Sequence, residues 1–142
     1  MERRDGWEHY LDEFIFKRKR SSFRYGKNDC CLFVADAIER MTGVDPAEKF
    51  RGQYKTKSEA YDLLKRFSNG EIEETVNKLA INYGMKRIDS NFAGRGDVVL
   101  VSSPMGNTLG VVVLTGEQVA IPARKGLMFY PTISILKAWR VG

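Results

Sequence analysis

The pattern of apolar and polar positions divides the chain into a helical first half and a strand-rich second half. Between residues 4 and 18, apolar side chains recur every three or four positions, which is typical of an amphipathic helix. They are Trp7, Tyr10, Leu11, Phe14 and Ile15. The same period returns from Cys30 to Met41, from Ala60 to Phe67 and from Glu71 to Asn82. We therefore expect four helices before residue 83.

The second half of the chain consists of short runs of β-branched and aromatic residues separated by turn residues, which predict strands. The runs cover residues 85–88, 96–101, 109–115, 118–123, 127–130 and 135–141. GDVVLV and LGVVVLT, joined by SSPMGN, indicate a hairpin. Helices followed by an antiparallel sheet predict an α+β fold, with a central helix laid on one face of a curved sheet. A single domain over residues 1–142 accounts for the whole chain.

The helix that begins near Cys30 has the clearest signals at both ends. Capping and turn residues, Gly26, Asn28 and Asp29, precede it, and Gly43 is expected to end it in a left-handed conformation. At one hundred degrees per residue, Cys30 shares its stripe with the side chains expected in the core, whereas Leu32 lies off that stripe. The core side chains are Phe33, Val34, Ala37, Ile38 and Met41. A later helix is expected to be capped by Ser58.

Cys30 has two interpretations. A thiol in the first turn of a helix is close to the positive end of the helix dipole, which favours the thiolate and is typical of a nucleophile. A free cysteine is also among the most buried residue types and often serves only as a small apolar side chain. Cys31, a quarter-turn away, is expected to be a packing residue.

Composition excludes several classes of function. The 142 residues carry a net charge of +5, and the densest basic run, Lys17 to Arg20, lacks any nucleic-acid recognition motif. No apolar run approaches the roughly 20 residues that span a bilayer, and the charged start is no secretory signal. Two adjacent cysteines favour neither a structural disulfide nor a metal site, and no cofactor motif is present. The only histidine, His9, is expected to face solvent.

Several motifs occur in the order found in a known family. Asp29-Cys30 followed by Phe33, then Gly96-Asp97-Val98-Val99, then Leu109 to Val112, resemble the motifs of NlpC-type cysteine peptidases, which have a papain-like fold and cut peptidoglycan peptides. The chain is also similar to a family of short proteins encoded in phage and prophage tail modules. That similarity extends over YGKNDCCLF, TGVDPA, FRGQYKT, GDVVLV, LGVVV and AWRV.

The resemblance to active peptidases implies Cys30 as the nucleophile, with Tyr25, Asn28 and Asp29 supporting the helix start. It also implies a histidine base at the position of Thr108 and a third polar group near Ala120 or Ile121. Neither threonine nor an apolar side chain accepts a proton from a thiol near neutral pH. The sequence therefore predicts an NlpC-type site without its base.

Two functions remain open at this point. The chain is a structural or assembly component of a phage tail, near the tip or baseplate, made in the host cytoplasm and carried in the virion with other tail proteins as partners. Alternatively, it is an active cysteine hydrolase of peptidoglycan peptides that uses Cys30 with a non-standard base, either His9 or a group from a partner. A peptidoglycan-binding module without chemistry is intermediate between the two.

Overall fold

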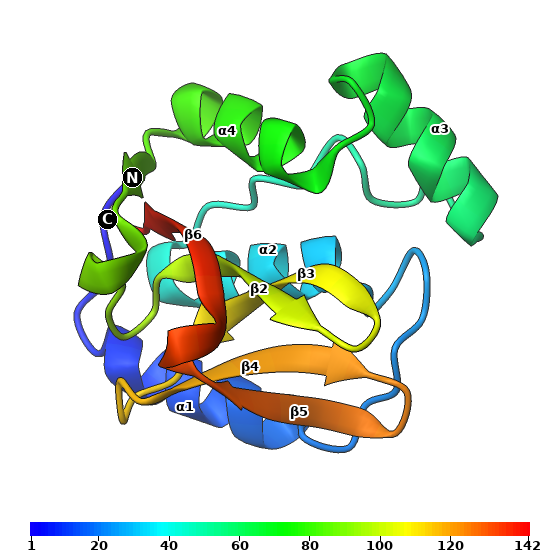
Figure 1. Cartoon of the computed structure of the whole chain (residues 1–142). Helices are drawn as coiled ribbons and strands as arrows, with labels where there is room; N and C mark the ends of the chain where they lie inside the picture. The colour runs from blue at the N-terminus through cyan, green and yellow to red at the C-terminus, as the bar shows by residue number, and fades with distance from the viewer.

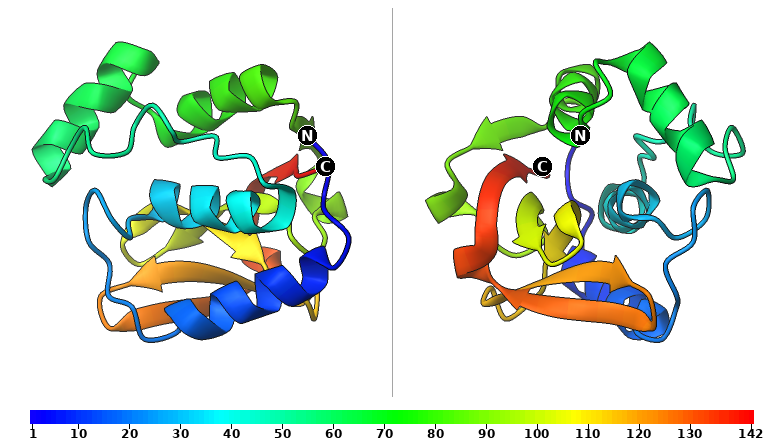
Figure 2. Two further views of the ribbon diagram at one scale, coloured as in Figure 1. Left: turned by 180° about the vertical axis from the view of Figure 1, so that it is seen from behind. Right: turned by 45° about the vertical axis from the view of Figure 1, so that its right-hand side comes forward.

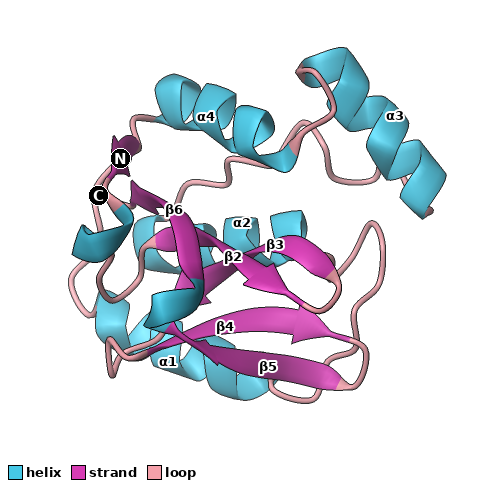
Figure 3. Ribbon diagram, viewed as in Figure 1, coloured by secondary structure: helices cyan, strands magenta, loops and turns pink.

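A computed structural model describes all residues, 1–142, and has the α+β architecture that the sequence predicts (Figures 1 and 3). The elements are α1 (Trp7–Arg18), α2 (Cys30–Thr42), α3 (Lys57–Phe67), α4 (Ile72–Tyr83), β1 (Lys86–Ile88), the 3₁₀ turn η1 (Ser90–Phe92), β2 (Val98–Ser103), β3 (Gly106–Val112), β4 (Gln118–Ala123), β5 (Gly126–Pro131), the 3₁₀ turn η2 (Thr132–Ser134) and β6 (Ile135–Arg140). At 11 to 13 residues, each of the four helices is shorter than the roughly 20 residues that cross a bilayer.

The six strands form one antiparallel sheet in the order β1-β6-β2-β3-β4-β5. Because side chains alternate across a sheet, β2 supplies two separate cores. Val98 and Leu100 join the larger core under the helices, whereas Val99 and Val101 join a smaller core on the other face. Both faces of β2 are therefore buried, which explains why this strand is continuously hydrophobic from Val98 to Val101.

The β2–β3 hairpin is longer at its tip than the sequence predicts. Its pairing extends to Ser103 opposite Gly106, so β3 begins three residues before the expected start at Leu109. The strand also ends at Val112 and not at Thr115, because the chain turns at Gly116, whose φ is +75°. The extended tip carries Thr108 on the strand itself.

Helices α1 and α2 form a layer on one face of the sheet, with α2 crossing β3 and β4 (Figure 2). The apolar stripe of α2 is buried in the larger core as expected. Leu32 lies off this stripe, as expected, but it is also buried, with only 1% of its surface exposed. It packs with Tyr54 and Ala47, since the segment after α2 folds back over the second face of the helix.

Helices α3 and α4 overhang α2 at the top of Figure 1. Val76 and Ala80 anchor α4 in the larger core, whereas α3 has no buried residue. The cap of α3 is Thr56 and not Ser58, because the Thr56 hydroxyl accepts the N–H of Glu59 at 3.1 Å while the Glu59 carboxylate accepts the N–H of Lys55 at 3.0 Å. The two hydrogen bonds resemble a capping box, in which the cap residue and the residue three positions later each accept a backbone N–H group.

A buried carboxylate joins the two ends of the chain, which lie side by side in Figure 1. Asp97 is 1% exposed and accepts a hydrogen bond from the Arg3 guanidinium at 2.9 Å. It also accepts the N–H groups of Val141 at 3.2 Å and Gly94 at 2.9 Å. The Gly-Asp pair before β2 is therefore a structural anchor, which accounts for Asp97 without any role in chemistry.

Candidate functional site

The segment before α2 is held by the side chain of Asp29, which is 5% exposed. Its carboxylate accepts the Leu32 N–H at 3.0 Å, the Gly26 N–H at 2.9 Å and the Tyr54 hydroxyl at 2.6 Å. Gly26 has a φ of +82°, and a Cβ there would lie 2.3 Å from the Tyr54 carbonyl oxygen, so only glycine fits. Asp29 thus fixes both the start of α2 and the approach of the loop that crosses it.

Asn28 and Tyr25 also support this segment. The Asn28 side chain accepts a hydrogen bond from Arg18 at 3.0 Å and donates to the Ser22 carbonyl at 3.0 Å. The Tyr25 ring packs edge-on against Phe23, with 4.8 Å between ring centroids, and burial raises the Tyr25 pKa. The three residues expected to support the helix start therefore all lie around it, each through a different contact.

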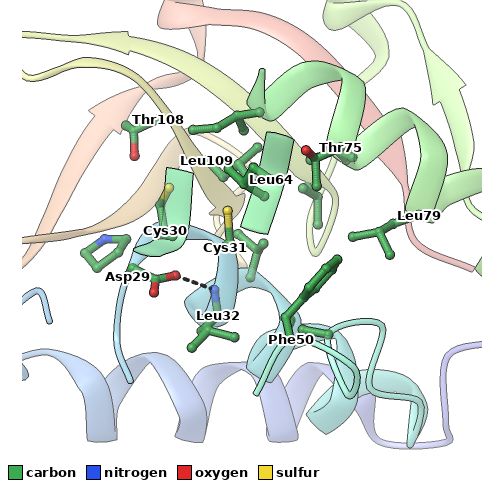
Figure 4. Close-up of a pocket in the computed structure, with 18 of the residues that line it drawn as sticks. Asp29, Cys30, Cys31, Leu32, Phe50, Leu64, Thr75, Leu79, Thr108 and Leu109 are labelled. Atoms are coloured by element: carbon green, nitrogen blue, oxygen red, sulfur yellow. Dashed lines mark hydrogen bonds between the residues drawn. The ribbon is translucent and has the colours of Figure 1, made fainter. Parts of the chain in front are cut away.

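Cys30 and Cys31 are the first two residues of α2, and both sulfurs face the same cavity (Figure 4). Hydrogen bonding at the helix start begins at Leu32, so the backbone N–H groups of Cys30 and Cys31 have no acceptor within the chain. Free N–H groups at a helix start are suited to stabilise negative charge, including that of a thiolate or an oxyanion. Because its sulfur faces the cavity and its N–H group is free, Cys31 is part of the site and not only a packing residue.

The pKa of the Cys30 thiol is lowered by the groups around it. Hydrogen bonding from the Cys31 thiol, opposed by burial, lowers the Cys30 pKa from its ordinary 9.0 to about 7. The backbone N–H of Leu109 and the Thr108 hydroxyl lower it further, whereas the nearby Asp29 charge raises it. The Cys31 pKa is raised in turn, because its proton is held between the two sulfurs. Near neutral pH about half of the pairs have therefore lost one proton, and Cys30 has substantial thiolate character.

Thr108 lies across the cavity mouth from Cys30, where the family motif places the catalytic histidine (Figure 4). It belongs to β3 and is 9% exposed. The hydroxyl donates to the thiolate but is too weak a base to remove a proton from a thiol. The structure thus brings the two motif positions together, with threonine supplying a hydrogen bond in place of proton transfer.

No other side chain replaces the missing base. Ala120 and Ile121 are fully buried within the sheet and do not line the cavity. The His9 side chain is 78% exposed on the outer face of α1, where its Nε2 lies 3.4 Å from the Glu13 carboxylate, and it too lies outside the cavity lining. The sequence prediction that His9 faces solvent is confirmed, and His9 is not positioned to act on Cys30.

The cavity in front of the two thiols has a volume of about 500 Å³ and is lined by 28 residues, of which 21 are hydrophobic. Its floor is α2 and β3, and its other walls come from α3, α4 and the loop before α3. The sequence pattern indicated the apolar faces of α3 and α4 but not that they line a cavity. Whether these faces pack together or line a cavity depends on the distance of the two helices from α2, and a local sequence pattern does not predict that distance.

These features define a class of protein. The crystal structure of the NlpC/p60 domain of the peptidoglycan hydrolase SagA is similar to this chain, with a TM-score of 0.57 over 94% of this chain and 97% of that one. The two sequences are 14% identical, so the likeness defines an NlpC/p60-like fold. No curated protein sequence matches the chain. Over residues 2–141 the chain matches, and belongs to, the family described as domain of unknown function DUF6950.

Proposed function

We propose that the protein is a phage tail component, at the tip, at the baseplate or in tail assembly, whose NlpC/p60-like domain lacks peptidase activity. The observation that supports the loss of activity is Thr108 facing Cys30 at the position of the base. General acid–base catalysis contributes about 100-fold to 10,000-fold to such reactions. A peptide bond also requires a proton on its departing amine, and the Cys31 thiol beside Cys30 is a poor donor because its pKa is raised well above the ordinary value.

The proposed tail role is supported by the sequence motifs shared with phage tail-module proteins. It is also compatible with large apolar side chains left on the surface, since exposed apolar groups favour contacts with other proteins. Ile133 is 92% exposed, Ile81 is 82% exposed and Phe16 is 76% exposed. In the tail, such side chains would be covered by neighbouring proteins.

The tail role is tested with purified phage particles and with a deletion of the gene. Mass spectrometry of tails is expected to detect the chain, and the deletion is expected to yield particles with defective tails. Normal tails that lack the chain, or normal assembly after deletion, would refute the proposal. A matched strain that carries Cys30→Ala separates assembly from chemistry, because it should form tails as well as the wild type does.

A second function, a cysteine hydrolase that receives its base from a partner, is favoured by the low Cys30 pKa. It is tested by incubating the purified protein with peptidoglycan peptides, alone and with isolated tails, and by analysing the products by mass spectrometry. Cleavage that disappears in Cys30→Ala would support the hydrolase and contradict the first proposal. The variant Thr108→His provides a comparison, because it restores a base at the position facing the thiolate.

A further inference from the structure

The lining of the cavity is unsuited to a polar ligand. Of its 28 lining residues, 21 are hydrophobic, and the carboxylate of Asp29 is already occupied by three donors. A sugar or a peptide stem placed deep in this space would leave buried hydrogen-bonding groups without partners, which disfavours its binding. The interior of the cavity therefore favours an aliphatic ligand.

Polar lining groups gather where β3 begins and β4 ends. Arg124 lies in the turn between β4 and β5, and Asn107 lies at the tip of the β2–β3 hairpin. Arg124 makes no ion pair within the chain, so its positive charge is available to a ligand. Thr108 and Cys30 follow immediately inside (Figure 4). This mouth combines the positive charge of Arg124 with hydrogen-bond donors, and the partly ionised Cys30 thiol lies just inside it.

The opposite end of the cavity is formed by α4, where Val76 and Leu79 contribute to the lining, with Met85 just beyond the helix. Along one side, α3 turns Leu63 and Leu64 toward the space. These two side chains are only half-buried, and no residue of α3 is fully buried. The apolar face of α3 is therefore incompletely covered by the protein itself, and an aliphatic ligand would complete its burial.

We propose that this cavity binds one long-chain fatty acid, with the hydrocarbon chain beneath α4 and the carboxylate at Arg124 and Asn107. The volume of about 500 Å³ suits a chain of about 16 carbons, if a methylene occupies about as much space as a water molecule, about 30 Å³. The positive charge of Arg124 at the mouth favours an anionic head group, and the apolar lining favours a hydrocarbon tail. The inference goes beyond the proposed tail role and does not depend on it.

The first test is isothermal titration calorimetry of the full-length protein with octanoate, decanoate, laurate and myristate below their micellar concentrations. Burying a methylene stabilises binding by about 0.8 kcal/mol, so the Kd is expected to fall about fourfold for each added carbon. Affinity that does not change with chain length, or no binding of any of the four acids, would overturn the proposal.

Paired variants locate the bound chain. Leu79→Gln is expected to weaken laurate binding at least tenfold, whereas Ile81→Gln, on the same helix but 82% exposed and outside the lining, is expected to bind like the wild type. If Leu79→Gln does not fold, as judged by circular dichroism, Leu64→Gln with Lys65→Gln as its control provides the same comparison. Equal affinities within both pairs would place the ligand elsewhere and overturn the proposal.

A second pair tests the head group. Arg124→Gln is expected to weaken laurate binding several-fold and to leave binding of the neutral alcohol dodecanol unchanged, whereas Lys125→Gln, which lies outside the lining, is expected to change neither. Laurate is also expected to slow alkylation of Cys30 by iodoacetamide, because its carboxylate would lie beside the thiol. Equal laurate affinity in Arg124→Gln, or an unchanged rate at Cys30, would contradict the assigned orientation.

Discussion

Replacement of Cys31 by alanine should raise the pKa of Cys30, because the Cys31 thiol is the largest single influence on the Cys30 thiolate. The pKa lies about two units below its ordinary 9.0, and each unit corresponds to about 1.36 kcal/mol. Without the Cys31 donor, burial would again favour the neutral thiol, and the pKa should return to the ordinary range. The thiolate fraction at pH 7 would then fall from about one half to about one hundredth.

The assay is the rate of alkylation by iodoacetamide between about pH 5 and about pH 10, with the Cys30 peptide quantified by mass spectrometry. Wild-type protein should show an inflection at about 7, and Cys31→Ala should react about fifty-fold more slowly at that pH. Cys31→Ser keeps a donor at the same position and should lie between the two. An inflection that stays at about 7 in Cys31→Ala would refute the assignment of Cys31 as the controlling group.

The other predictions concern the supports of the site. Asp29→Ala should lower the free energy of unfolding by about 2 to 4 kcal/mol in urea denaturation, because α2 loses its cap and the buried Tyr54 hydroxyl loses its acceptor; a loss below about 1 kcal/mol would contradict this. Asp97→Ala should cost about 3 to 5 kcal/mol in the same assay, because the partly buried Arg3 loses its ion-pair partner and the N–H groups of Gly94 and Val141 lose their acceptor, and a near-neutral result would show that Arg3 escapes to solvent. His9→Ala should leave stability within about 0.5 kcal/mol and the rate of thiol alkylation unchanged, and a slower rate would place this histidine in the site.

Local signals predicted the central helix correctly at both ends. Asp29 caps α2 through the Leu32 N–H, and Gly43 ends it with a φ of +82°. Both devices act over three or four residues, so the sequence alone determines them. The position of Thr108 opposite Cys30 was predicted in another way, from the order of motifs along an NlpC-type chain, since no local pattern relates a helix to a distant strand.

Features that depend on distant packing were not predictable. The phase of α2 placed Leu32 away from the core, but a helix can bury two faces when a later loop covers the second one, as the Tyr54 loop does here. The apolar stripe of α3 indicated burial, yet its inner side chains line a cavity. The influence of Cys31 on Cys30 was not predicted either. It arises because both side chains face the same cavity at the start of α2, and no local pattern predicts that cavity.

A thiolate with only a weak proton donor beside it discriminates between substrates by their leaving groups. In an amide, the departing amine must be protonated, and the Cys31 thiol is a poor donor because its pKa is raised well above the ordinary value. In a thioester, attack by the Cys30 sulfur forms one carbon–sulfur bond as another breaks, and the leaving thiolate departs with its electron pair and needs no proton. We therefore expect Cys30, and not its Cys30→Ala variant, to accept an acyl group from a small thioester, detected as a mass increase, while matched peptide amides stay intact. Cleavage of those amides by the isolated protein would mean that a proton donor does operate at the site, and the argument from Thr108 would then fail.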